Sequence, residues 1–149
     1  MKIVVDTNII FSALLNSNST IADLLFNSGE TFDFYSCSYM HNEIQKHWDR
    51  LKKISKLSEE QLQISFTKVI SKLTFISEEI IPVETWLASE QLTTGIDVDD
   101  TDFVALTKFL RANLWTGDKV LYNGLKKLNF KKLLNTTELL SLRAAKEKF

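Results

Sequence analysis

Four short acidic stretches stand in this chain, each placed just past a run of strand-like residues. If those runs are parallel strands, the acids meet at the carboxyl edge of one sheet, where open α/β sheets bind their ligands. Carboxylates held together repel one another, so we expect a raised pKa on at least one of them, with the neighbouring acids as a main cause. Oxygen ligands of this kind suit Mg²⁺ or Mn²⁺, which predicts a metal-dependent enzyme. The stretches are Asp6, Glu43, the group Asp97, Asp99, Asp100 and Asp102, and Asp118.

Each acid alone has a structural explanation. Asp6-Thr7-Asn8 supplies residue types that are common at helix caps. The run from Asp97 to Asp102 suits the positive end of a following helix, and Asp118 suits an N-cap. Glu43 alone is typical of a solvated helix face. Four separate loops with acids at one predicted sheet edge favour a common site over four independent caps.

Strand-like and helix-like segments alternate along the chain. This pattern predicts an α/β fold, a three-layer α/β/α sandwich with a mostly parallel central sheet and right-handed crossovers. The expected strands are residues 3–5, 32–37, 74–76, 114–116 and 132–134. The expected helices are residues 7–15, 20–26, 38 to beyond 51, 59–70, 82–92, 103–110, 119–128 and one beginning at 137.

Capping residues set several of these expected boundaries. Ser38 is expected to cap one long helix that contains Glu43 and continues past residue 51. Ser58 and Gln61 form a capping-box pattern. Pro82 suits the first turn of a helix, and Gly29 suits the position after the end of one.

Length and composition are those of an ordinary globular domain. The 149 residues, 44% hydrophobic and 25% charged, predict one domain with a full core. One cysteine allows no internal disulfide, and the amino terminus does not resemble a secretory signal. No apolar run approaches the roughly 20 residues that span a bilayer. We therefore expect a cytoplasmic protein that does not enter a membrane.

Basic and acidic residues are segregated although the net charge is only −1. Residues 73–102 contain eight acids and no Lys or Arg, whereas residues 119–149 contain eight basic residues and two acids. Such runs are usually solvated helix faces. They also suit a nuclease, which needs carboxylates for metal ions and cations for the phosphate backbone.

The ordered set of motifs resembles the PIN-domain nucleases. The motifs are Asp6-Thr7-Asn8, Glu43 within Tyr39-x-x-x-Glu-Ile, Asp100-x-x-Phe-Val-Ala-Leu-Thr, and Leu-Trp-Thr-Gly-Asp118. The final Asn135-Thr136-Thr137-Glu138-Leu139-Leu140 is similar to the last strand-to-helix junction of that family. The resemblance runs from Ile3 to about Leu140.

The resemblance implies a single-strand ribonuclease that uses Mg²⁺ or Mn²⁺ and leaves a 5′-phosphate and a 3′-hydroxyl. The metal-site acids would be Asp6, Glu43, Asp100 and Asp118, with Asp99 in place of Asp100 if the loop shifts by one residue. Thr7, Asn8 and Thr116 would orient carboxylates or water.

The chain also resembles the toxin half of VapBC toxin-antitoxin pairs. This resemblance implies a homodimer held inactive by an antitoxin. The chain is predicted to differ from compact toxins of this kind by a helical insert at about residues 54–81. The whole chain, residues 1–149, is predicted to be one PIN-like domain.

Three cations are expected to hold the RNA near the acids. Lys119 directly follows Asp118, while Lys46 and Arg50 stand one and two helical turns beyond Glu43. Lys46 and Glu43, three residues apart on one helix, would share a face.

Other kinds of site fit the residues less well. His41 and His47 are six apart, so one helix would not direct both at one zinc ion. Cys37, in a strand pattern, suits a buried inert thiol, and no glycine-rich phosphate loop is present. A Mg²⁺-dependent phosphohydrolase of the haloacid dehalogenase type would need Asp at position 8, where Asn8 stands. A catalytically silent PIN-like module that binds RNA or protein stays open as an alternative.

Overall fold

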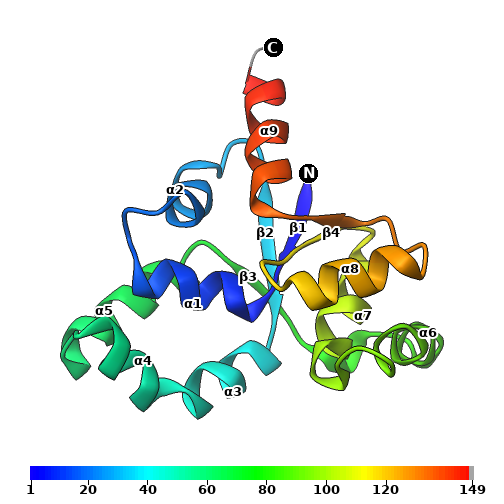
Figure 1. The fold of residues 1–149 in the computed structure, drawn as a ribbon, viewed down its shortest axis with the longest axis horizontal. Helices are drawn as coiled ribbons and strands as arrows, with labels where there is room; N and C mark the ends of the chain where they lie inside the picture. The colour runs from blue at the N-terminus through cyan, green and yellow to red at the C-terminus, as the bar shows by residue number, and fades with distance from the viewer. Residues whose placement is uncertain (148–149) are drawn as a thin grey trace.

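A five-stranded parallel sheet forms the centre of the computed structural model, which describes residues 1–147 (Figure 1). The strand order is β3-β2-β1-β4-β5, so the first strand lies in the middle. The strands are β1 (Lys2–Val5), β2 (Asp33–Cys37), β3 (Thr74–Ile76), β4 (Asn113–Trp115) and β5 (Leu133–Leu134). All four strand pairs are parallel, so the carboxyl ends of the strands share one edge of the sheet.

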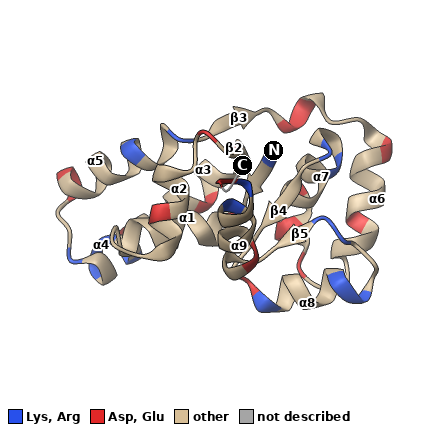
Figure 2. Cartoon of the chain, turned by 90° about the horizontal axis from the view of Figure 1, so that it is seen from above, with Lys and Arg blue, Asp and Glu red and all other residues tan. Residues whose placement is uncertain are grey.

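Helices cover both faces of the sheet. Figure 2 shows α1 and α2 on one side and α6 and α7 on the other. The α-helices are α1 (Thr7–Leu15), α2 (Thr20–Asn27), α3 (Tyr39–Lys46), α4 (Trp48–Ser55), α5 (Glu59–Ile70), α6 (Val83–Thr93), α7 (Thr101–Leu110), α8 (Lys119–Lys127) and α9 (Thr136–Glu147). Short 3₁₀ turns, η1 (Glu78–Ile80) and η2 (Val98–Asp100), precede α6 and α7. The predicted α/β/α sandwich with a parallel sheet is therefore confirmed.

The middle strand is apolar because both faces are covered. Ile3, Val4 and Val5 are completely buried, as expected for a strand inside a parallel sheet. Val4 lies between Tyr35 of β2 and Leu114 of β4. This central position places the end of β1 next to the ends of both neighbouring strands.

The predicted long helix after Ser38 is wrong, because the chain forms two helices there. α3 ends at Lys46, and His47 has φ −108° and ψ 13° between α3 and α4. Ser38 has helical φ and ψ angles and makes no side-chain capping bond. After the break, α4 buries Trp48 and Leu51 in the core.

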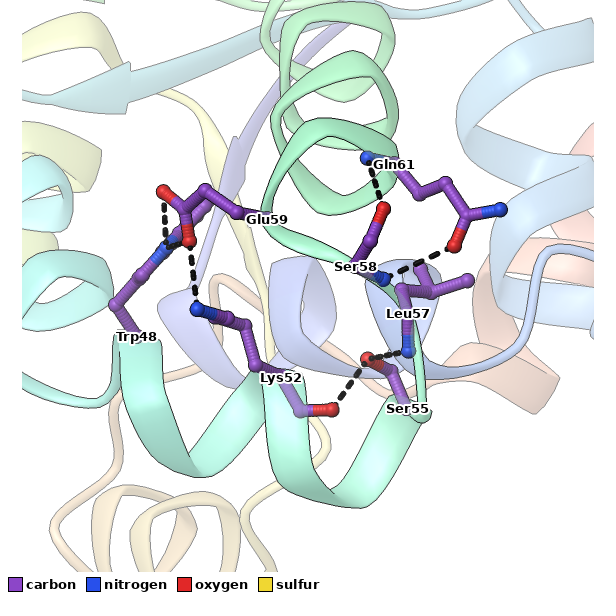
Figure 3. Close-up of polar contacts among 7 residues, drawn as sticks. All are labelled: Trp48, Lys52, Ser55, Leu57, Ser58, Glu59 and Gln61. Carbon is purple, nitrogen blue, oxygen red and sulfur yellow. Dashed lines mark hydrogen bonds and ion pairs between the residues drawn. The ribbon is translucent and has the colours of Figure 1, made fainter.

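Polar contacts hold α4 against the start of α5 (Figure 3). The Trp48 indole N–H donates to both carboxylate oxygens of Glu59, at 3.0 and 2.8 Å. Lys52 forms an ion pair with the same carboxylate at 3.1 Å. Ser58 and Gln61 exchange the two hydrogen bonds of a capping box, which confirms that predicted helix start. The α4–α5 pair is thus fixed by its own residues.

Two predictions about the domain organisation of the chain stay predictions. One is the single domain of residues 1–149, and the other is the helical insert at about 54–81, where α5, β3 and η1 lie. Lys148 and Phe149, which end the predicted basic stretch, lie outside the described residues. Among residues 1–147 no single helix is both long and apolar enough to cross a membrane, and the pair α1 and α2, which together pass that test, is bent by 107°.

Candidate active site

Asp6 lies at the end of β1 and begins α1. Its side chain is 4% exposed and accepts two hydrogen bonds. One comes from the Thr7 backbone N–H to Oδ1 at 2.8 Å, which caps α1. The other comes from the Thr116 hydroxyl to Oδ2 at 2.7 Å. Asp6 is therefore held in one orientation at the carboxyl edge of the sheet.

Thr116 joins the end of β4 to the end of β1. Its hydroxyl oxygen accepts from the Asp118 backbone N–H at 3.1 Å and from the Asn8 side-chain amide at 3.4 Å. The Asn8 carbonyl oxygen accepts from the Gly117 N–H at 3.1 Å. Asp118 in turn caps α8 by accepting from the N–H groups of the residues two and three positions later. This network fixes Asp118 beside Asp6.

Glu43 reaches the same edge from α3. Its Oε1 accepts from the Thr7 hydroxyl at 2.6 Å. Partial burial raises the pKa of Glu43, and the carboxylates of Asp99 and Asp97 add to the rise. Thr7 thus links the end of β1 to Glu43. The two threonines that were predicted to orient carboxylates, Thr7 and Thr116, each donate a hydrogen bond to one, Thr7 to Glu43 and Thr116 to Asp6.

Asp100 comes from the η2 turn between α6 and α7, so the prediction that every acid follows a strand is wrong at this position. The hydroxyls of Thr93 and Thr101 lie 2.6 Å apart and join the two helices beneath the turn. A Cβ on Gly124 would lie 2.7 Å from the Ile96 side chain, so glycine lets α8 approach this turn closely. These contacts place Asp100 near the acids of β1 and α8.

Asp99 and Asp100 face different surroundings. Asp100 Oδ2 is buried and has no hydrogen-bond partner within residues 1–147. Asp99 is exposed and accepts a long hydrogen bond from the Tyr39 hydroxyl at 3.4 Å. The buried oxygen therefore belongs to Asp100, the acid that the resemblance to the PIN-domain motif favours over Asp99.

Burial and mutual repulsion raise the pKa of these acids. Burial raises the pKa of Asp6 to about 7, and Glu43 and Asp118 contribute further. Burial raises the pKa of Asp100 to about 8, with added repulsion from Asp6, Asp97, Asp118 and Glu43. The prediction of at least one raised pKa holds, although burial contributes more than the neighbouring acids do. A bound cation would neutralise these carboxylates and stabilise their ionised form.

The donors present fit a divalent metal ion. Asp6, Glu43 and Asp118 lie close enough to Asp100 to raise its pKa, and Asp100 Oδ2 is buried without a partner among the described residues. Hard oxygen ligands are those that Mg²⁺ and Mn²⁺ take in proteins. Within residues 1–147 no three of the four predicted acids bring ligand oxygens within 4.8 Å of one another. Their roles as ligands are therefore a proposal.

A second acidic group lies beside the first and was not predicted. Cys37 Sγ and carboxylate oxygens of Glu78 and Asp102 lie within 4.8 Å of one another. Burial, with Glu78 and Asp102 nearby, raises the pKa of the Cys37 thiol, which agrees with a buried and unreactive sulfur. Burial and Glu78 raise the pKa of Asp102 to about 6. Sequence reasoning missed this group because Glu78 begins the η1 turn, far from Cys37 along the chain, and only the fold brings the two together.

The three predicted RNA-binding cations lie in different settings. Lys119 lines a cavity together with Thr116 and Asp118. Lys46 is exposed at the end of α3, on the same helix as Glu43. Arg50 belongs to α4 and lines an apolar cavity beyond the break at His47. The expectation that one helix presents both Lys46 and Arg50 is wrong.

Comparison with known proteins agrees with this fold. No curated protein sequence matches the chain. A chain of the crystal structure of VapBC2 from Rickettsia felis, bound to a DNA fragment from their promoter, has a similar fold. It is 19% identical, the match covers 91% of this chain and 98% of that chain, and the TM-score is 0.63. The family model of the PIN domain matches residues 4–143 of the 149, so this chain belongs to the PIN domain family.

Proposed function

We propose that this protein is a metal-dependent ribonuclease that hydrolyses phosphodiester bonds in single-stranded RNA. The main observation is the buried Asp100 oxygen, which has no hydrogen-bond partner in the described part of the chain. It lies close to Asp6, Glu43 and Asp118, since each raises the pKa of Asp100. Buried acids that repel one another, placed at the carboxyl edge of a parallel sheet, suit a site that receives a divalent cation. Membership of the PIN domain family supports the same reaction class.

Each side chain has a distinct role in this proposal. Asp6, Glu43, Asp100 and Asp118 would hold Mg²⁺ or Mn²⁺. When bound, such an ion activates water and stabilises the charge that develops on the phosphodiester oxygens. Thr116 and Thr7 orient Asp6 and Glu43 through bonds of 2.7 and 2.6 Å. Asn8 holds the loop before Asp118 through the Gly117 N–H. Cleavage would leave a 5′-phosphate and a 3′-hydroxyl.

The fold also supports a role in a toxin-antitoxin pair. The similar chain belongs to a structure whose title names VapBC2 and promoter DNA. By analogy, we propose that this protein is the toxin, acts in the cytoplasm as a homodimer, and is held inactive by an antitoxin protein.

Chelation provides the first test of this function. The protein with Mg²⁺ or Mn²⁺ should cleave a labelled single-stranded RNA, and excess EDTA should stop cleavage reversibly. The reason is that the acids repel one another and, within residues 1–147, none of the four forms an ion pair with Lys or Arg. Product ends are read by phosphatase and ligase treatment. Cleavage that continues unchanged in EDTA would contradict the metal-dependent mechanism, and RNA binding without any cleavage would indicate the catalytically silent module.

Salt dependence tests the predicted cations. Replacing Lys46, Arg50 and Lys119 by Ala should weaken RNA binding and reduce the slope of log affinity against log salt by roughly one unit per lost phosphate contact. Different RNA sequences should be affected similarly, since phosphate contacts do not read bases. Fluorescence anisotropy measures the slope.

The matched control replaces three exposed lysines that lie away from the acids, Lys68, Lys72 and Lys146, by Ala. Its slope should change less than that of the first variant. Equal slopes in wild type and in the first variant would place the RNA elsewhere, over residues 126–132.

A further inference from the structure

A cavity lined mainly by polar residues lies beside the proposed metal site, between the beginnings of α8 and α9. Its volume is about 410 Å³, within the range of about 300 to 1,000 Å³ that is usual for small-ligand sites. Figure 1 shows both helices beginning near the carboxyl edge of the sheet. The cavity is lined by Thr116, Gly117, Asp118, Lys119, Tyr122, Asn123, Asn135, Thr136 and Thr137.

Two lining residues connect the cavity directly to the acids. Thr116 donates to Asp6 Oδ2 at 2.7 Å, and Asp118 is one of the four proposed metal-site acids. A nucleic-acid strand whose scissile phosphate lies at these acids must continue past them on one side or the other. The cavity lies immediately next to this point.

The cavity is rich in donors that the protein does not use. Within residues 1–147 the side chains of Lys119, Asn123 and Thr137 make no hydrogen bond to another residue. Asn135 uses its carbonyl oxygen for the Glu138 N–H at 2.8 Å, which leaves its NH₂ group free of a partner among the described residues. Asp118 is the one acid in the lining. Free N–H and O–H donors with one lysine suit phosphate and ribose oxygens.

The walls of the cavity are fixed before any ligand arrives. Glu138 Oε1 accepts from the Tyr122 hydroxyl at 2.7 Å and from the Asn135 N–H at 2.9 Å, which joins α8 to the start of α9. The Trp115 indole N–H donates to the Thr136 hydroxyl at 3.1 Å. A preformed wall loses little entropy on binding, which favours a specific subsite over a loose surface contact.

We propose that this cavity binds the nucleotide adjacent to the scissile phosphate of single-stranded RNA. Lys119, Asn123, Asn135 and Thr137 donate hydrogen bonds to its phosphate and ribose. The inference rests on the proposed ribonuclease function and adds to it the location of the substrate strand. It also separates Lys119, which lines the cavity, from Lys46 and Arg50, which do not.

A charge-neutral double variant tests the subsite. Asn123→Ala with Thr137→Ala removes one amide and one hydroxyl without changing the net charge, so long-range attraction of RNA is kept. The KM for a single-stranded RNA oligomer should rise at least about fivefold, roughly 1 kcal/mol, while kcat changes less than about twofold. The matched control, Gln91→Ala with Thr94→Ala, changes two exposed residues at the end of α6 and directly after it. It should leave KM unchanged, and both variants should melt like wild type.

Amide chemical shifts locate the strand independently. In an NMR titration with a single-stranded RNA hexamer in EDTA, the side-chain NH₂ signals of Asn123 and Asn135 should shift and saturate. An unchanged KM in the double variant, or shifts confined to α3 and α4 around Lys46 and Arg50, would overturn the subsite while cleavage by wild type upholds the ribonuclease. A wild type that neither binds nor cleaves RNA would overturn both.

Discussion

Asp6→Asn is expected to reduce RNA cleavage by at least about a hundredfold without unfolding the protein. Loss of a side chain that merely orients a metal ligand already costs roughly 10- to 100-fold, and Asp6 is proposed to be a ligand itself. The fold should survive because Asn keeps the oxygen that caps α1 through the Thr7 N–H. Initial cleavage rates with saturating Mg²⁺ or Mn²⁺ measure the loss.

Three further substitutions serve as comparisons. Asp49→Asn, at an exposed position of α4, should leave the rate unchanged. Asp100→Asn should match Asp6→Asn, whereas Asp99→Asn should cost less. Asp99 is exposed, while Asp100 has a buried oxygen with no partner among residues 1–147. Full activity of Asp6→Asn would show that the cluster does not perform the chemistry. The reverse order for the two neighbouring acids would make Asp99 the ligand.

Much of the fold could be predicted because local signals agreed with the tertiary packing. The Ser58–Gln61 capping box and Pro82 marked helix starts that the structure contains at α5 and α6. The apolar run at residues 3–5 marked a strand buried on both faces. At these places propensity and burial favour the same conformation.

The features that sequence reasoning missed depend on contacts between distant residues. Nothing local ends α3 at Lys46; the break follows from burying Trp48 against α5, where its indole meets Glu59. The helices before and after Asp100 were expected at residues 82–92 and 103–110, yet this acidic stretch was still assigned to the end of a strand-like run. The structure places Asp100 in the η2 turn between α6 and α7. The grouping of Cys37, Glu78 and Asp102 likewise arises from where η1 meets the end of β2.

The acidic residues of the candidate site could be predicted from the sequence, whereas their burial and the cavity beside them could not. Spacing and residue order were enough to nominate Asp6, Glu43, Asp100 and Asp118. They could not show that burial would exceed mutual repulsion as the cause of the raised pKa values of Asp6 and Asp100, because burial depends on the surrounding helices. The cavity beside Asp118 was equally hidden, since its walls come from two helix starts that only the folded sheet brings together.

The metal-free protein is expected to be less stable at pH 8.5 than at pH 5.5. Asp6 has a pKa of about 7 in the fold, against about 3.9 in an unfolded chain. The folded state therefore binds more protons than the unfolded state in this window, and the free energy of unfolding falls as pH rises. Asp6 alone contributes a loss of about 2 kcal/mol across it. Asp100, with a pKa of about 8, acts in the same direction. Urea unfolding of EDTA-treated protein at both pH values measures the difference.

Asp6→Asn removes this contribution and separates it from other pH effects. The variant should be more stable than wild type at pH 8.5 without metal, and its stability should change less between the two pH values. Mg²⁺ or Mn²⁺ should then stabilise wild type at pH 8.5 by mass action and stabilise the variant much less, because one of the four acids has lost its charge. The exposed substitution Asp49→Asn should follow wild type throughout. The same pH dependence of stability and the same response to metal in wild type and Asp6→Asn would mean that the charge of Asp6 does not destabilise the fold and that Asp6 is not a metal ligand. A smaller pH dependence and a smaller metal response in Asp6→Asn would connect the instability of the metal-free fold to the site proposed for cleavage. The same buried carboxylate would then destabilise the metal-free protein and bind the metal ion.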